Sequence, residues 1–138
     1  MVLSSINLPA VFAAGISSFI VGGMWYSKRI FGKAWMAESK LTEEKIKQRN
    51  KGKLFGFTAL FSILMAFTLA VFLTDAMWDA KIGVIEGVMA GVIAGIWTFC
   101  AIAIHSLFEL KSWRYIFING CYSVISLILM GAIIGWWR

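Results

Sequence analysis

The residues best suited to chemistry lie at the two ends of one long apolar segment, residues 83–108. Glu86 stands near its start, and His105 near its end is followed four residues later by Glu109. Residues four apart on a helix are neighbours on one face, so His105 and Glu109 are expected side by side. Histidine exchanges protons near neutral pH. An ionisable group inside a bilayer is costly unless it is paired or meets water, so all three are candidates for a proton or ligand site.

Three further polar side chains are expected near His105 at the same end of the molecule: Tyr26, Asn119 and Tyr122. Two readings of this group stay open, a polar cluster that fixes helix register and a ligand or proton-relay site. A metal site is disfavoured, because one His and one Glu leave the ligand shell incomplete. For Glu86 the alternative to a site is a hydrated carboxylate near the membrane surface. No sequence motif predicts a catalytic residue or a cofactor.

Glycines recur at spacing four in two segments, which favours close helix packing, because backbones approach most closely where side chains are smallest. The positions are Gly83, Gly87, Gly91 and Gly95 in the first segment and Gly131 and Gly135 in the second. We favour packing of the first stripe, a glycine zipper, within the chain, and packing against the same span of a second copy is the open alternative. The second is then left as a spare face for self-association.

The helices that would position these residues follow from composition. The chain has 138 residues, of which 60% are hydrophobic and only 14% charged, and its mean hydropathy is +0.81. A soluble chain of this size would expose large apolar patches. We therefore predict an all-α, integral membrane four-helix bundle with glycine-rich interfaces, forming a single domain over residues 1–138. Its spans are expected near 6–26, 54–74, 83–108 and 115–137, because about 20 apolar residues cross a bilayer.

The charge distribution predicts how the bundle is oriented. Nine of the thirteen Lys and Arg lie between Lys28 and Lys53, and such clusters stay in the cytoplasm. The loop 27–53 is therefore expected in the cytoplasm, with both termini outside. The net charge of +6 is attributed to this loop, so we predict contact with anionic lipids rather than nucleic acid.

Within the loop, residues 28–36 mix cations with aromatic and aliphatic side chains, which suits a segment lying among lipid headgroups. Thr42 is a predicted helix N-cap, because carboxylates follow it at Glu43 and Glu44. We expect that helix to continue through the basic residues into the second span. Trp78, in the short connection to the third span, is a predicted membrane-interface anchor.

Several local motifs resemble a known family. Trp25-Tyr26-Ser27 precedes Phe31-Gly32-Lys33-Ala34-Trp35-Met36, Leu107-Phe108-Glu109 ends the third span, Asn119 with Tyr122 opens the fourth, and Met130-Gly131-Ala132 lies near its end. Over nearly the whole chain these resemble the bacterial small four-span membrane proteins grouped as domain of unknown function 1761. The resemblance implies the architecture and a location in the cytoplasmic (inner) membrane of a bacterium, and it supplies no substrate or catalytic residue.

Three functions are compatible with the sequence. The favoured one is a non-enzymatic membrane protein that moves or senses a small solute or proton as a homo-oligomer, because four spans rarely enclose a pathway alone. The alternative is a structural or accessory subunit of a larger membrane complex. A membrane-embedded enzyme that modifies lipids with His105 and Glu109 is a third, less favoured hypothesis.

Overall fold

Short polar side chains set where three of the long helices begin. The Asn7 side chain accepts the Ala10 N–H at 3.2 Å before the first helix, the Asn50 side chain accepts the Lys53 N–H at 3.0 Å before the second, and the Ser112 hydroxyl accepts the Tyr115 N–H at 3.1 Å before the last. Each bond satisfies one of the backbone donors that a helix start leaves open.

The computed structural model describes residues 2–74 and 81–137. Its elements in chain order are η1 (Val2–Ser5), α1 (Leu8–Trp25), α2 (Gly32–Ser39), α3 (Glu43–Gln48), α4 (Lys51–Phe72), α6 (Val84–Phe108) and α7 (Trp113–Trp136). Four of them, α1, α4, α6 and α7, are long and apolar enough to cross a membrane. The prediction of an all-α protein with four long apolar helices is confirmed, and these helices are consistent with four membrane spans. The predicted interface anchor Trp78 lies outside the described residues.

One prediction about the basic loop is wrong. The helix capped by Thr42 does not continue into the second span but ends at Gln48, and Arg49 is extended with φ −62° and ψ 147°. Asn50 then caps a separate helix, α4. The capping bond offers the backbone an alternative to helical continuation, which explains why the chain breaks here. The predicted cap at Thr42 itself is confirmed, because its hydroxyl accepts the Lys45 N–H at 3.3 Å.

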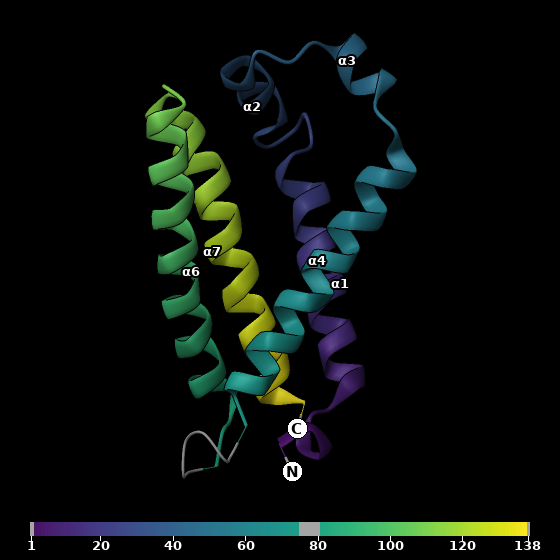
Figure 1. Cartoon of the computed structure of the whole chain (residues 1–138), viewed down its shortest axis with the longest axis vertical. Coiled ribbons are helices and arrows are strands. Elements are labelled where there is room, and N and C mark those ends of the chain that lie inside the picture. Colours follow the sequence, from purple (N-terminus) through teal and green to yellow (C-terminus); the bar gives the residue numbers. More distant parts are fainter. Residues whose placement is uncertain (1, 75–80, 138) are drawn as a thin grey trace.

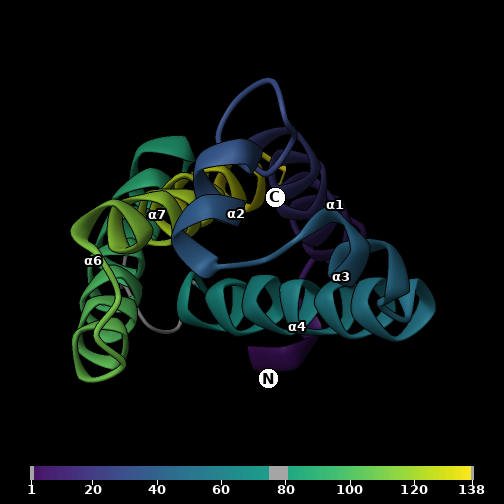
Figure 2. The same ribbon diagram turned by 90° about the horizontal axis from the view of Figure 1, so that it is seen from above.

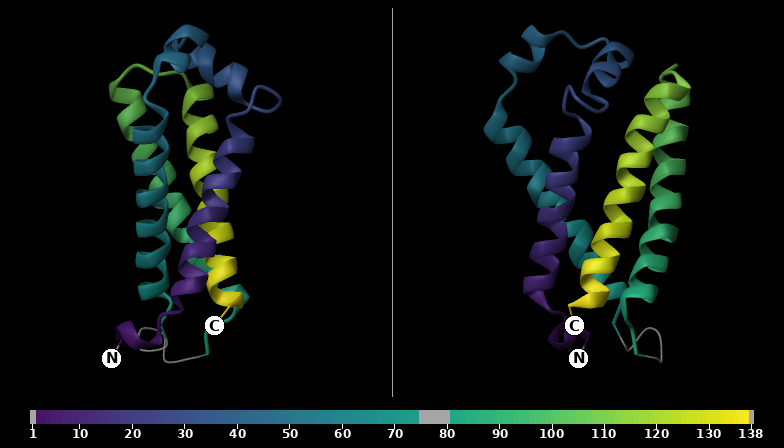
Figure 3. Two further views of the ribbon diagram at one scale, coloured as in Figure 1. Left: turned by 90° about the vertical axis from the view of Figure 1, so that its right-hand side faces the viewer. Right: turned by 180° about the vertical axis from the view of Figure 1, so that it is seen from behind.

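The four long helices contact one another to different extents (Figure 1). Helices α6 and α7 run side by side along their length, while α1 packs on both α4 and α7. Both termini lie at one end, which we name the terminal end; α2 and α3 lie at the other, the loop end (Figure 3). Seen from the loop end, α4 runs obliquely across the bundle and α2 lies over α7 (Figure 2).

The buried core lies mainly in the half of the bundle nearer the terminal end. It is built from Val11 and Ala14 of α1, Ala66, Leu69 and Ala70 of α4, Ala90 of α6, and Leu127, Met130 and Ile134 of α7, with Leu73 and Ile82 beside the helix ends. Toward the loop end α4 leans away from α6 and α7 (Figure 1). There its apolar side chains are exposed, including Phe57 and Phe61 at 52% and 57%.

Candidate functional site

A polar cluster joins α1 to α7 near the loop end. The Tyr26 hydroxyl donates to Asn119 Oδ1 at 2.5 Å, and the Tyr122 hydroxyl donates to the Ser18 carbonyl at 3.2 Å. The Tyr26 and Tyr122 rings meet edge to face, with centroids 5.4 Å apart. The structure therefore brings together three of the six candidate residues, Tyr26, Asn119 and Tyr122. Tyr26 lies 93 residues before Asn119 in the sequence.

Two tryptophans extend this cluster, and the sequence analysis did not assign them to it. Trp25 Nε1 donates to the Ile118 carbonyl at 2.9 Å, and the Trp35 ring of α2 packs on Tyr26 with centroids 5.2 Å apart. Both belong to the quoted Trp-Tyr-Ser and Gly-Lys-Ala-Trp motifs, so their position in the sequence was a signal. The cluster thus ties the start of the loop to both long helices.

His105 and Glu109 lie apart from this cluster. Both are exposed, and Glu109 is the C-cap that follows the last residue of α6, with its N–H donating to the His105 carbonyl at 3.1 Å. Within residues 2–74 and 81–137, no side-chain hydrogen bond or ion pair involves either residue. Their expected neighbourhood with Asn119 and Tyr122 is not formed in the single chain, because His105 lies on a face of α6 that α7 does not cover.

Glu86 has a structural partner at the opposite end of α6. Its Oε2 accepts the Gly83 N–H at 2.8 Å, and it lies in the first helical turn. A carboxylate there meets the positive end of the helix and satisfies one open donor. Glu86 is half-buried and far along α6 from His105, so the two groups form separate features.

The glycines of α6 face α7 directly. A Cβ built at Gly87 would overlap the Gly131 carbonyl oxygen, and one at Gly91 would come within 2.7 Å of Ile128 Cα. A Cβ at Gly135 would come within 2.9 Å of the Gly83 carbonyl carbon. The structure thus places Gly131 and Gly135 against α6 of the same chain, and not on the spare face that we expected for self-association.

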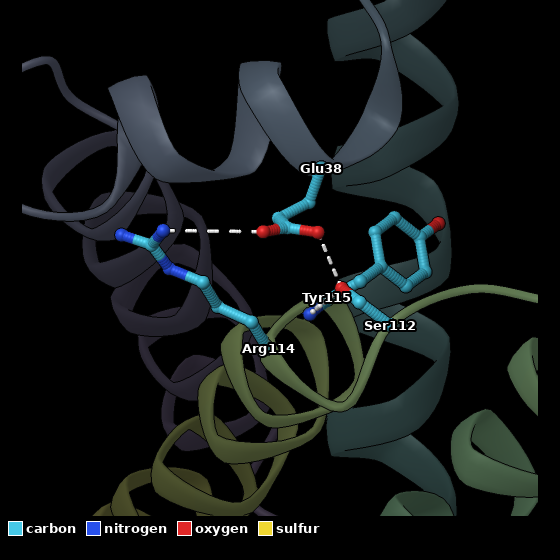
Figure 4. A network of polar contacts seen from close by, with 4 residues as sticks. All are labelled: Glu38, Ser112, Arg114 and Tyr115. Carbon is cyan, nitrogen blue, oxygen red and sulfur yellow. Dashed lines mark hydrogen bonds and ion pairs between the residues drawn. The ribbon is translucent and has the colours of Figure 1, made fainter.

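A second polar contact fastens α2 to the start of α7 (Figure 4). The Ser112 hydroxyl donates to one Glu38 carboxylate oxygen, and Arg114 Nη1 lies 3.9 Å from the other. Ser112 also caps α7 through the Tyr115 N–H. Sequence reasoning missed this contact, because it joins residues 74 apart, and nothing in the local pattern singles out Glu38 as paired.

The described part of the structure contains hollows at the terminal end and between α4 and α6. One, of about 440 Å³, lies at the terminal end and is lined by residues that include Asn7, Lys81 and Trp137. The other, of about 340 Å³, lies between α4 and α6 and is lined almost entirely by apolar side chains. In the described parts of the chain, no three His, Cys, Asp or Glu side chains gather as metal ligands would.

Comparison with known proteins identifies the same family that the sequence motifs resemble. A family model described as "Protein of unknown function (DUF1761)" matches residues 9–135. No curated protein and no solved structure matches the chain. Because the match extends over all four long helices, the chain belongs to the DUF1761 family.

Proposed function

We propose that this protein is a non-enzymatic membrane protein that moves or senses a proton or small solute as a homo-oligomer. One observation carries the proposal: His105, the only histidine, is exposed on the outside of the single chain although it lies within the apolar helix α6. It lies three residues before the last residue of α6. At 1.5 Å per residue, this places it about 4.5 Å along the axis from that end of the helix.

Ionisable side chains within membrane helices almost always face a bundle interior or a water-filled space, because exposure to lipid is costly. The single chain offers His105 no such cover. A second copy packed on this face of α6 supplies it, and places His105 and the neighbouring Glu109 between subunits. The site is then completed only in the oligomer.

The same proposal assigns the other features. The loop end, with its basic residues, lies in the cytoplasm of a bacterial cell. Close backbone contact through the glycines holds α6 to α7 within each copy. The cluster of Tyr26, Asn119 and Tyr122 ties the loop to the bundle, so that a change at the loop reaches both α1 and α7.

Proton flux and oligomeric state test the proposal together. Liposomes containing the protein and a trapped pH-sensitive dye are given a potassium diffusion potential, and the internal pH is followed. We expect a wild-type oligomer by light scattering, and a flux that falls about tenfold in His105→Ala, which corresponds to ~1.4 kcal/mol. Cys100→Ala is the matched control, because Cys100 is also exposed on α6 and should leave the flux unchanged.

A monomeric wild-type protein would contradict the shared site. Flux equal to that of empty liposomes would exclude proton movement, and together with a monomeric state it would leave the second candidate, an accessory subunit of a larger membrane complex. That candidate is favoured by a different observation, the exposed apolar side chains of the first half of α4. It predicts that a membrane partner co-purifies and that Phe57→Ala weakens the association while His105→Ala does not.

A further inference from the structure

Two buried hydroxyl groups between α1 and α7 lack a hydrogen bond of ordinary length. Ser126 of α7 is 2% exposed, and its Oγ has no hydrogen-bond partner within the described parts of the chain. Ser18 of α1 is 3% exposed, and its Oγ lies 3.5 Å from the hydroxyl oxygen of Tyr122. Hydrogen bonds between hydroxyl groups are usually about 2.5–3.0 Å long. A buried hydroxyl without a partner costs free energy, and lipid offers no substitute for that partner.

The two serines lie at the same depth on neighbouring helices. Helices α1 and α7 run antiparallel (Figure 1), and the Asn7 side chain donates to the Trp137 carbonyl at 3.0 Å at the terminal end. Eleven residues separate Asn7 from Ser18, and eleven separate Ser126 from Trp137. At 1.5 Å per residue, both serines lie about 16 Å from that hydrogen bond. They are therefore level with each other in the interior of the bundle.

Ser126 lies on the face of α7 that contacts α1. It follows Tyr122 by four residues, and four residues turn a helix through about 400°, so the two side chains lie about 40° apart around the axis. Tyr122 reaches α1, because its hydroxyl donates to the Ser18 carbonyl at 3.2 Å and lies 3.0 Å from where a Cβ at Gly22 would be. Ser126 therefore faces α1 at the level of Ser18, one helical turn from Tyr122.

We propose that Ser18, Tyr122 and Ser126 bind a water molecule in the interior of the bundle. The water accepts hydrogen bonds from the two serine hydroxyls and donates one to the Tyr122 oxygen, whose own proton goes to the Ser18 carbonyl. Three hydrogen bonds are about the usual number for a buried water. Such a water needs only about 10–15 Å³ of space, far less than the hollows described above.

The bound water extends the polar cluster toward the middle of the membrane. Ser126 lies thirteen residues after the first residue of α7 and ten before its last, so it is near the centre of that helix. Polar groups between α1 and α7 then extend from Tyr26 and Asn119 at the loop end to the centre of the bundle. All of these residues belong to one chain. The water site therefore does not depend on the oligomer of the proposed function, and its failure would leave that proposal unaffected.

Water-edited solid-state NMR tests the site directly. Protein labelled with ¹³C-serine is placed in phosphatidylcholine bilayers, and the transfer of magnetisation from water protons to each serine Cβ is followed. The Ser126 signal is identified by its loss in Ser126→Ala. Transfer to Ser126 should be several-fold faster in the wild type than in Ser18→Val, which removes one hydroxyl and fills the space of the water. Ser123→Ala is the matched control and should leave the transfer unchanged, because the Ser123 hydroxyl donates within its own helix, to the Asn119 carbonyl at 3.3 Å.

The sign of a stability change is a second test, and it needs only conservative variants. Removing a buried hydroxyl destabilises a protein if that hydroxyl has a partner, and is neutral or stabilising if it has none. We expect a lower melting temperature for Ser126→Ala and for Ser18→Ala, and little further loss in the double variant, because both hydroxyls bind the same water. An unchanged or raised melting temperature in Ser126→Ala would overturn the proposal. Additive losses in the double variant, or equal water transfer in the wild type and Ser18→Val, would do the same.

Discussion

Helices α6 and α7 form a closely packed pair, whereas α4 leaves its partners along half of its length. Both regions contain glycines within apolar helices. A Cβ at Gly87 would overlap the backbone of α7, but a Cβ at Gly56 of α4 would meet nothing within 4 Å. Glycine alone therefore does not bring helices together. Close approach requires a second helix whose own small residues stand opposite, as Gly131 and Gly135 do here.

The largest expected effect is at the closest contact. Gly87→Ala should lower the stability by about 2–3 kcal/mol, because the added methyl group forces the two backbones apart. Gly56→Ala is the matched control and should be neutral or stabilising by up to about 1 kcal/mol, because alanine favours the helix and the site is open. Thermal unfolding in detergent, followed by circular dichroism, checks both. If both substitutions change the stability equally, the close contact between α6 and α7 contributes no more to stability than the open site on α4.

Tyr26→Phe removes the hydroxyl that donates to Asn119 while keeping the ring on Trp35 and Tyr122. We expect a loss of about 1 kcal/mol, in the range found for hydrogen bonds between membrane helices. Tyr115→Phe is the control, because no hydrogen bond of its hydroxyl is found in the described structure. If the two variants unfold at the same temperature, the polar cluster does not stabilise the contact between α1 and α7.

Glu38→Gln weakens the contact between α2 and the start of α7. The pair is partly exposed, so the expected cost is below about 1 kcal/mol. Hydrogen exchange in residues 32–39 is the more sensitive measurement and should become faster. Glu44→Gln, which alters an exposed carboxylate of α3, should leave that exchange unchanged.

The smallest effect is expected at Glu43, which pairs with Lys28 at 2.5 Å on the exposed surface. A hydrogen bond from the Lys28 ammonium holds the pKa of the Glu43 carboxyl below its ordinary value. A lowered pKa contributes stability that is present above the ordinary carboxyl pKa of about 4.3 and is lost as the pH falls through the lowered value. In the variant Glu43→Gln, the free energy of unfolding should therefore depend slightly less on pH than in the wild type, and only below about pH 4.3.

Patterns of neighbouring residues predict those features, such as helix caps, that depend on only a few residues close together in the sequence. Thr42 was identified as a cap because its side chain and the following carboxylates act within one turn. The sequence pattern does not reveal Asn50 as a cap, because the basic residues on both sides of it predict one continuous helix. The contact of Glu38 with Ser112 and Arg114 was missed because no local pattern links positions so far apart in the chain.

The sequence by itself determined four apolar helices and a basic loop, because burial of apolar length in a bilayer depends on composition and little else. Only the tertiary structure decided which helix faces meet. From sequence alone, the glycine stripes on residues 83–95 and 131–135 can pack within a chain or between chains, because helix association in lipid has no hydrophobic driving force that would exclude either. Backbone complementarity between α6 and α7 made that choice, and it left His105 on the outside.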